Sequence, residues 1–315
     1  MSLKYLITGA TGGLGAEVLN YFINNVPTSQ FAAASSKESN RKQFEDRGLA
    51  FRVVNYDDKE SLKRSLTGVE NLLFVSTNVF DNERRAKQHE NVVEAAKRAG
   101  VGHVWYTSLA FGGFKSDSKA SIQLAHLVTE QLLEKSGITY TSIREGIYTE
   151  AFPIFLGWYP DTQTVYLPFE GRAAYTSRTE LGEATARLMV RGGYENQIVL
   201  LTAREVLRFK DIVDVINETT DRHVELKFVS PDEYVRISAN NDQGGKPAAF
   251  FKGVVSWYEA LRDGDGETTD ALMADLLGRE PKGAREVIRE LLSKDRDYTW
   301  HQNYFNREGN SVIQR

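Results

Sequence analysis

The sequence of 315 residues contains no cysteine. This absence excludes disulfide bonds, thiolate nucleophiles, zinc–thiolate sites and iron–sulfur clusters. Only five histidines are present, and they are scattered, so we expect no metal site. No apolar run approaches the roughly 18 residues that cross a membrane, and the first strand-like segment follows Lys4 without the apolar stretch of a secretion signal. The sequence therefore predicts a cytoplasmic protein without a membrane partner.

Charge of either sign is not in large excess. The chain has 39 Lys and Arg against 43 Asp and Glu, a net charge of −4, and the two signs are interspersed. This balance removes the bulk electrostatic attraction on which binding to nucleic acid depends. With 41% hydrophobic residues and only seven prolines, the composition is that of a globular protein rather than a disordered one. The expected partner is a small molecule.

The first half of the chain alternates short β-rich runs with segments of helical periodicity. This alternation predicts a parallel sheet covered by helices on both faces, a doubly wound α/β (Rossmann) fold. Helices are expected over 14–25 and 84–99. Strands are expected near 3–8, 30–35, 51–55, 71–76, 103–107 and 139–144.

After about residue 150 the alternation stops. We expect a dinucleotide-binding domain over 1–150, to which 173–203 return, and a smaller, mainly helical substrate region made of 151–172 and 204–315. A strand is expected at 197–202. The predicted helices are 178–191, 209–219, 231–239, 247–262, 268–277 and 283–293.

Three glycines at a fixed spacing give the strongest local signal. Gly9, Gly12 and Gly15 follow the first strand and open the first helix. In such a unit the first glycine permits a tight turn, the second lets backbone amides approach a pyrophosphate, and the third permits close helix–strand packing. The helix N-terminus adds an attraction for negative charge. The motif predicts a dinucleotide-binding loop.

The end of the second strand indicates which dinucleotide binds. A carboxylate there would bond the ribose 2′-hydroxyl of NAD, whereas hydroxyl and basic groups accept the 2′-phosphate of NADP. Here the strand ends in Ser35, Ser36 and Lys37, with Arg41 four residues further on. Glu38 begins the next helix, where a side chain points to solvent. The sequence therefore favours NADP(H), the alternative being that Lys37 and Arg41 belong to a solvated helix face.

Several segments together carry a family resemblance. The chain resembles the NmrA-like atypical short-chain dehydrogenases, and among them most closely the bacterial NADPH:quinone oxidoreductases. The likeness covers roughly the first 200 residues and returns at 276–281. The matching segments are 8–15, 25–30, 68–73, 88–97, 106–109, 130–133, 136–141 and 144–148.

The resemblance implies a set of cofactor contacts. Two positions depart from the family pattern, since Ser36 replaces a usual arginine and Asn55 replaces a usual acid, which leaves adenine recognition to that amide or to Asp57 or Asp58. Contacts to the pyrophosphate fall to Gly9, Ala10, Thr11, Gly12, Gly13 and Leu14. Contacts to the 2′-phosphate fall to Ser36 and Lys37, and those along the nucleotide to Ser76, Thr77, Asn78 and Ser108. The nicotinamide end falls to Thr141, Arg144, Glu145 and Gly146.

The usual proton donor of this superfamily is missing. Ordinary members use Tyr-x-x-x-Lys, in which the cation lowers the tyrosine pKa so that the phenol can transfer a proton. Alignment on 130–133 places Ile122 and His126 at these two positions, and Leu109 stands where many relatives carry a catalytic serine. The replacement donors that we consider are His126, one turn from Ile122, and Tyr148, after the sixth strand.

Three interpretations remain open. NADPH could reduce a quinone-like acceptor that draws its protons from water, another residue could donate the proton, or the protein could sense NADP without turnover and bind a protein partner. We favour an NADPH-dependent reductase of a quinone-like or conjugated, aromatic carbonyl substrate. A specialised-metabolism ketoreductase or isomerase is a further alternative. Aromatic residues support either a core or a wall for a flat substrate, namely Phe152, Phe155, Trp158 and Tyr159.

Overall fold

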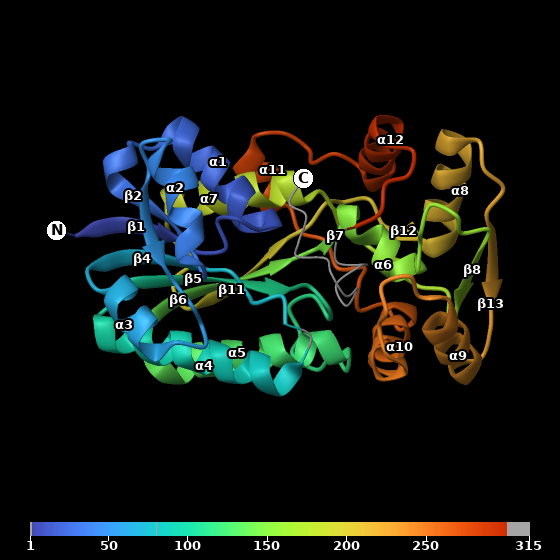
Figure 1. Cartoon of the computed structure of the whole chain (residues 1–315), viewed down its shortest axis with the longest axis horizontal. Helices are drawn as coiled ribbons and strands as arrows, with labels where there is room; N and C mark the ends of the chain where they lie inside the picture. The colour runs from blue at the N-terminus through green and yellow to red at the C-terminus, as the bar shows by residue number, and fades with distance from the viewer. Residues whose placement is uncertain (1, 80, 301–315) are drawn as a thin grey trace.

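The computed structural model describes residues 2–79 and 81–300. Its centre is a seven-stranded, all-parallel sheet in the order β11-β6-β5-β4-β1-β2-β3 (Figure 1). This order, with helices on both faces, confirms the predicted doubly wound α/β fold. The sheet strands are β1 (Leu3–Ile7), β2 (Phe31–Ser35), β3 (Ala50–Val53), β4 (Val69–Phe74), β5 (His103–Leu109), β6 (Thr139–Glu145) and β11 (Gln197–Leu201).

Helices cover the sheet in two layers (Figure 1). One layer holds α3 (Lys59–Leu66), α4 (Asn82–Ala99) and α5 (Ser121–Ser136), and the other holds α1 (Gly13–Asn25), α7 (Arg178–Arg191) and α11 (Leu272–Leu277). Between β1 and β3 lie the short helices η1 (Thr28–Gln30), η2 (Glu38–Asn40) and α2 (Arg41–Glu45). Because both faces are covered, a central strand such as β2 is buried along its whole length.

Local sequence explains where these helices start and stop. The apolar stripe of α1 faces the sheet, with Leu14, Val18 and Phe22 buried. Gly100 ends α4 with φ of +67°, a left-handed conformation that glycine adopts without strain. The helix predicted from 268 begins only at Leu272, because the Asp270 carboxylate accepts a hydrogen bond from the Leu272 amide and so forms a local turn just before the helix.

The remaining elements build a second hydrophobic core beside the carboxyl ends of the strands (Figure 1). Its short strands pair in twos, and the sequence did not predict them because strands of two to four residues carry too little periodicity. The strands are β7 (Ile147–Tyr148), β8 (Thr164–Leu167), β9 (Arg172–Ala173), β10 (Tyr175–Thr176), β12 (Leu207–Arg208) and β13 (Glu225–Phe228). The helices are η3 (Thr149–Ala151), α6 (Phe152–Leu156), α8 (Phe209–Thr220), α9 (Pro231–Asn241), α10 (Ala248–Arg262) and α12 (Ala284–Lys294).

Segment 173–203 contacts both parts of the chain. Its strand β10 pairs with β7, and its strand β11 pairs with β6 at the edge of the large sheet. The segment predicted to form the substrate region extends to residue 315, of which 301–315 lie outside the described residues. Within 2–79 and 81–300, none of the helices has the length and apolarity that a membrane span requires.

Candidate cofactor and substrate site

The glycine loop forms a tight turn between β1 and α1. Gly9 has φ of +64°, and its carbonyl accepts a hydrogen bond of 2.8 Å from the Gly12 amide. A Cβ on Gly15 would lie 2.4 Å from the Gly9 carbonyl oxygen, so no larger residue fits without moving the backbone. The three glycines of the motif therefore bring the helix N-terminus close to the end of β1.

This helix N-terminus is open to an anion. Gly12 is its N-cap and supplies no side chain, and the first turn of α1 holds no acidic residue. The guanidinium of Arg178, at the start of α7, lies beside the loop, since a Cβ on Gly13 would be 2.5 Å from its Nη1. The Arg178 Nε is buried and has no hydrogen-bond partner among the described residues. A helix N-terminus and a cation therefore meet at one place, which suits a pyrophosphate.

The predicted 2′-phosphate residues differ in their environment. Ser36 and Lys37 are exposed at the end of β2, whereas Ser35 is buried and its Oγ accepts a 2.9 Å hydrogen bond from the Asn40 side-chain Nδ2. Arg41 forms ion pairs with two nearby glutamates, Glu38 in η2 and Glu45 in α2. The structure thus leaves Ser36 and Lys37 accessible and engages Arg41 with two carboxylates.

Asn55, after β3, is part of a turn. Its Oδ1 accepts a hydrogen bond of 3.0 Å from the Asp57 amide, so this oxygen already has a partner. Asp57 in turn accepts hydrogen bonds from Arg84 and Gln88, both at 2.9 Å. Adenine recognition by these side chains stays a prediction.

The segment after β4 is held by buried groups of α4. The Thr77 amide donates to His89 Nε2 at 3.2 Å, and the Thr77 carbonyl accepts from Arg85 at 2.7 Å. The Ser76 amide donates to the Thr107 hydroxyl at 2.9 Å, while Asn78 is exposed. Burial lowers the His89 pKa to about 3, so its ring is neutral and can accept these bonds. Sequence reasoning did not identify His89 and Arg85 as groups that position this segment.

His126 is buried and both of its ring nitrogens have partners. Its Nδ1 pairs with the Tyr106 hydroxyl at 2.8 Å, and its Nε2 lies 3.4 Å from Arg85. Burial, with the charge of Arg85, lowers its pKa well below the usual value. The imidazole is therefore neutral and carries no spare proton, which weakens the hypothesis that it is the proton donor.

Arg144 and Ser108 both bind the carboxylate of Glu130. Arg144 is fully buried and forms an ion pair of 2.6 Å with Glu130, which also accepts a 2.8 Å hydrogen bond from Ser108. The remaining donors of Arg144 contact the loop after β5 at Gly113, Lys115 and Ser116. These contacts position that loop and leave neither predicted residue free for a cofactor.

Thr141 lies far from the other predicted residues. It is four residues before Glu145 on β6, about 13 Å along a strand. Its hydroxyl donates to the Tyr194 carbonyl at 2.8 Å. Thr141 therefore lies toward the amino end of the strand, whereas ligands of doubly wound folds bind at the carboxyl end.

Glu145, predicted at the nicotinamide end, and Tyr148, predicted as a candidate proton donor, lie together at the carboxyl end of β6. The Tyr148 hydroxyl donates to Glu145 Oε2 at 2.6 Å. Burial raises the pKa of Glu145 to about 8, and burial together with that carboxyl raises the pKa of Tyr148. Gly146 lies between them, where a Cβ would be 2.3 Å from the Thr176 hydroxyl. The structure therefore places an acid that is protonated at neutral pH where the nicotinamide end was predicted.

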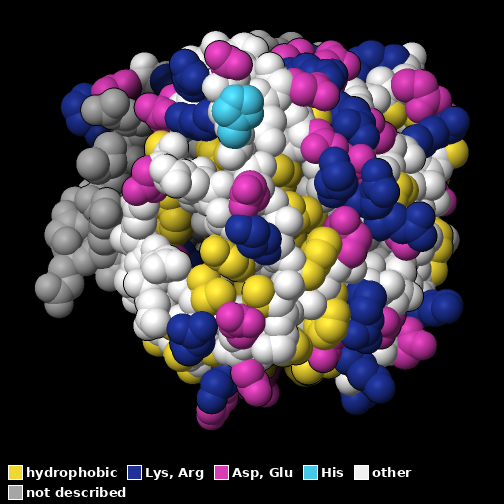
Figure 2. Space-filling view, turned by 90° about the vertical axis from the view of Figure 1, so that its right-hand side faces the viewer, with side chains coloured by type: hydrophobic (Ala, Val, Ile, Leu, Met, Phe, Trp, Pro, Cys, Tyr) yellow, Lys and Arg dark blue, Asp and Glu magenta, His cyan; other side chains and the backbone are white. Residues whose placement is uncertain are grey.

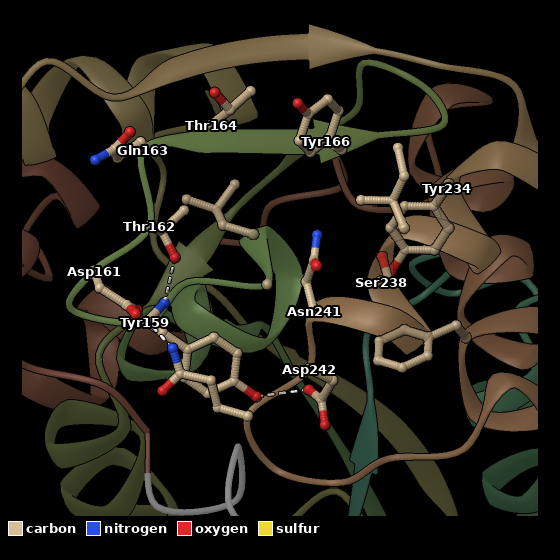
Figure 3. Close-up of a pocket in the computed structure, with 15 residues that line it drawn as sticks. Tyr159, Asp161, Thr162, Gln163, Thr164, Tyr166, Tyr234, Ser238, Asn241 and Asp242 are labelled. Atoms are coloured by element: carbon tan, nitrogen blue, oxygen red, sulfur yellow. Dashed lines mark hydrogen bonds between the residues drawn. The ribbon is translucent and has the colours of Figure 1, made fainter.

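The predicted aromatic cluster is mostly core. Phe152, Phe155, Trp158 and Tyr159 are all buried within the second hydrophobic core or at its margin. Beside them lies a cavity of about 410 Å³, lined by α6, β8, α9, α10 and the connecting loops (Figure 3). The Tyr159 hydroxyl donates to Asp242 at 2.6 Å at its edge. Because no lining residue comes from the dinucleotide-binding half, this cavity is separate from the glycine loop.

The described residues hold no metal cluster, and the end of the molecule that carries α8, α9 and β13 has no surface of a single charge sign. In the part of the chain that the structure describes, no group of three His, Asp or Glu side chains is placed to hold a metal ion. On the face seen in Figure 2, Lys and Arg alternate with Asp and Glu around scattered apolar side chains. That face offers no basic patch of the kind that binds nucleic acid.

Comparison with known proteins identifies the family. The model of the NmrA-like family matches residues 1–275. The chain belongs to the NmrA-like family. It is 56% identical to the NmrA-like family domain-containing oxidoreductase flvB of Aspergillus flavus, over 96% of this chain and 99% of that protein. The predicted family membership is therefore confirmed.

Solved structures of two reductases resemble the whole fold. The Escherichia coli NADPH-dependent quinone oxidoreductase QOR2, solved with NADPH, has a TM-score of 0.82 and 26% identity, over 91% of this chain and 99% of that one. The Citrobacter sp. triphenylmethane reductase, solved with NADP(H), has a TM-score of 0.80 and 28% identity over the same shares of the two chains.

Proposed function

We propose that this protein is an NADPH-dependent reductase of a quinone-like or other conjugated, aromatic carbonyl compound. The full-length relative at 56% identity is named an oxidoreductase, and two structural neighbours were solved with NADPH or NADP(H). These relatives confirm the predicted oxidoreductase class and the predicted cofactor. The names of the neighbours, a quinone reductase and a reductase of triphenylmethane dyes, support a conjugated aromatic acceptor.

The observation that carries the proposal is the open N-terminus of α1. Its cap, Gly12, carries no side chain, and Arg178 adds a positive charge beside Gly13. The exposed Ser36 and Lys37 end the adjacent strand without an acid. This combination fits a pyrophosphate together with a 2′-phosphate.

The residues divide the work of binding and reduction. The bound cofactor supplies a hydride to the acceptor carbon. The loop from Gly9 to Leu14 and Arg178 would hold the pyrophosphate, and Ser36 with Lys37 would hold the 2′-phosphate. His89 and Arg85 keep the segment after β4 in place through the Thr77 backbone. The chain has no Tyr-x-x-x-Lys sequence, and our alignment puts Ile122 and His126 at those positions, so we propose a reaction without that pair.

Calorimetry with NADPH and NADH tests the cofactor site. We expect NADPH to bind more tightly than NADH, and Lys37→Glu to weaken NADPH roughly tenfold or more while changing NADH little, because only the former carries the 2′-phosphate. Lys42→Glu is the matched control, since Lys42 is exposed on the next helix and pairs with Asp46. Equal binding of both nucleotides by the unchanged protein would contradict the assignment of Lys37.

Turnover of acceptors tests the reaction. Purified protein with NADPH and a panel of naphthoquinones, phenanthrenequinone and conjugated aromatic ketones should consume the nicotinamide absorbance faster than the buffer control. Tight NADPH binding without turnover across that panel would instead favour the alternative of an NADP-sensing regulatory protein.

A further inference from the structure

The carboxyl end of β6 carries a buried acid that the binding of a dinucleotide does not require. The residue Glu145 is 1% exposed to solvent, and its Oε2 accepts the hydrogen bond from the Tyr148 hydroxyl. Its Oε1 is buried and has no hydrogen-bond partner among the described residues. A buried carboxyl oxygen without a partner is costly and calls for a functional explanation.

Other unpartnered polar atoms occur on the chain segments next to Glu145. The Tyr175 hydroxyl and the Thr149 hydroxyl are buried without partners among residues 2–79 and 81–300. Tyr175 lies beside Ile147 in the pairing of β10 with β7, and Thr149 directly follows Tyr148. Arg178, whose Nε is also unpartnered, starts the helix after β10. Of these groups, Arg178 lies close enough to act on Tyr148, the hydrogen-bond partner of Glu145, whereas the Tyr175 ring packs against Phe155 in the second hydrophobic core.

We propose that Glu145 is the general acid of this reductase, with Tyr148 as the residue that positions its carboxyl group. The inference rests on the proposed function and deepens it by naming the missing proton donor. The acceptor carbon receives the hydride of NADPH, the electron pair of its C=O bond moves to oxygen, and that oxygen takes the proton from Glu145 Oε1. Glu145 is left as a carboxylate, which regains a proton from water after product release, while NADPH becomes NADP⁺.

The surroundings of Glu145 keep it protonated before the reaction. Burial is the main cause of its raised pKa, and the hydrogen bond from Tyr148 opposes this rise only in part. The other charged groups at this place are Glu150 from η3 and Arg178 from α7, which also act on Tyr148. The Glu150 carboxylate is itself occupied, because both of its oxygens accept from the Arg178 amide at 3.0 and 3.1 Å. Burial raises the pKa of Glu150 too. Because both Glu150 oxygens are engaged whereas Glu145 Oε1 has no partner among the described residues, we assign the proton to Glu145.

The strand geometry separates Glu145 from its charged sequence neighbour. Successive side chains of a strand point to opposite faces. Arg144 faces α5, where it pairs with Glu130, whereas Ile143 belongs to the core beneath α1 and α7. Glu145 shares the face of Ile143, so the Arg144 charge lies on the other side of the sheet. This arrangement keeps the Arg144 guanidinium, which would favour the ionised carboxylate, on the opposite face of the sheet.

Infrared difference spectroscopy of the protein without cofactor tests the proton directly. We expect a protonated carboxyl band that titrates near pH 8 and is absent from Glu145→Gln. In Tyr148→Phe the band should titrate at higher pH, because the hydrogen bond that favours the carboxylate is lost. Glu134→Gln, an exposed glutamate of α5, is the matched control and should keep the band. A Glu145 carboxyl that titrates in the usual range near 4.5 would overturn the proposal.

Kinetics then separates proton donation from substrate binding. With phenanthrenequinone, a neutral acceptor, Glu145→Gln should lower kcat by roughly 100-fold, the lower range for loss of a general acid, with the Kd for NADPH changed less than about twofold. With malachite green, a cation that accepts hydride without a proton, the same variant should retain most of its kcat. Unchanged kcat on the quinone would overturn the proposal. Weaker binding of the dye as the only effect would also overturn it and would make Glu145 an anchor for cationic substrates.

The two proposals fail in different ways. If the unchanged protein does not bind NADPH in calorimetry, the proposed function is wrong whatever Glu145 does. If it binds and oxidises NADPH with a quinone while Glu145→Gln matches it, only the inference about the acid is wrong. Thermal melting of each variant shows whether a loss of activity reflects unfolding.

Discussion

Replacement of Glu130 by glutamine tests how the loop after β5 is held. Arg144 is fully buried and donates hydrogen bonds to the Glu130 carboxylate through Nε and Nη2. Glu130 is the sole carboxylate among the contacts described for Arg144. Glu130 also accepts hydrogen bonds from Ser108 and Ser142. In Glu130→Gln the guanidinium stays buried with its charge uncompensated.

The expected cost follows from that unpaired charge. Removing one partner of a buried ion pair typically costs about 3–5 kcal/mol, a large share of the roughly 5–15 kcal/mol that holds a domain folded. At roughly 2 °C per kcal/mol for a large domain, the melting temperature should fall by about 6–10 °C. Because Arg144 also holds Gly113 and Lys115, the loop should become susceptible to proteolysis before the rest of the chain.

Urea unfolding followed by tryptophan fluorescence measures this loss. Glu134→Gln lies one helical turn away and is exposed, so it should change stability by no more than about 0.5 kcal/mol. In a double-mutant cycle, Glu130→Gln with Arg144→Gln should cost at least about 1 kcal/mol less than the sum of the single variants. If Glu130→Gln costs no more than its control, or if the two effects simply add, the ion pair does not hold the loop.

Three further predictions concern the glycine loop, the segment after β4 and the buried acid. Gly15→Ala should cost about 1–3 kcal/mol and weaken NADPH binding, because its Cβ would meet the Gly9 carbonyl at 2.4 Å; Gly253→Ala, with its nearest neighbour at 3.8 Å, should be neutral or stabilising in the same melting assay. His89→Ala should raise the Kd for NADPH roughly tenfold in a fluorescence titration, since the Thr77 amide loses an acceptor worth about 1–2 kcal/mol, and an unchanged Kd would refute this role. Between about pH 4.5 and 8 the folded state binds the Glu145 proton more tightly than the unfolded state, so its contribution to stability declines as pH rises through this window; Glu145→Gln should lack this decline in urea midpoints at pH 5.5, 7 and 8.5, and parallel curves for the two proteins would contradict it.

The fold was predictable because its signals are local. The glycine loop, the buried run of β2 and the apolar stripe of α1 each specify an element within a short window of sequence, and all three occur in the structure. The pairing of β8 with β13 could not be predicted, because four residues cannot distinguish a strand from a loop and the partners are distant in sequence. Arg178 escaped notice for the same reason, since only the packing of α7 against α1 brings it to Gly13.

The four residues predicted at the nicotinamide end show where a motif stops being informative. Thr141, Arg144 and Glu145 share one strand, so their order along it and the alternation of its faces already separate them. Arg144 must lie on the face opposite Glu145, and a buried arginine requires a carboxylate from a helix on that face, which Glu130 supplies. Sequence alone does not show which face meets the glycine loop, because that depends on the side of the sheet on which α1 packs. Once that side is fixed, Glu145 is the group that faces the loop's side of the sheet, and the same alternation that buries Arg144 in a structural ion pair keeps its guanidinium on the face opposite Glu145.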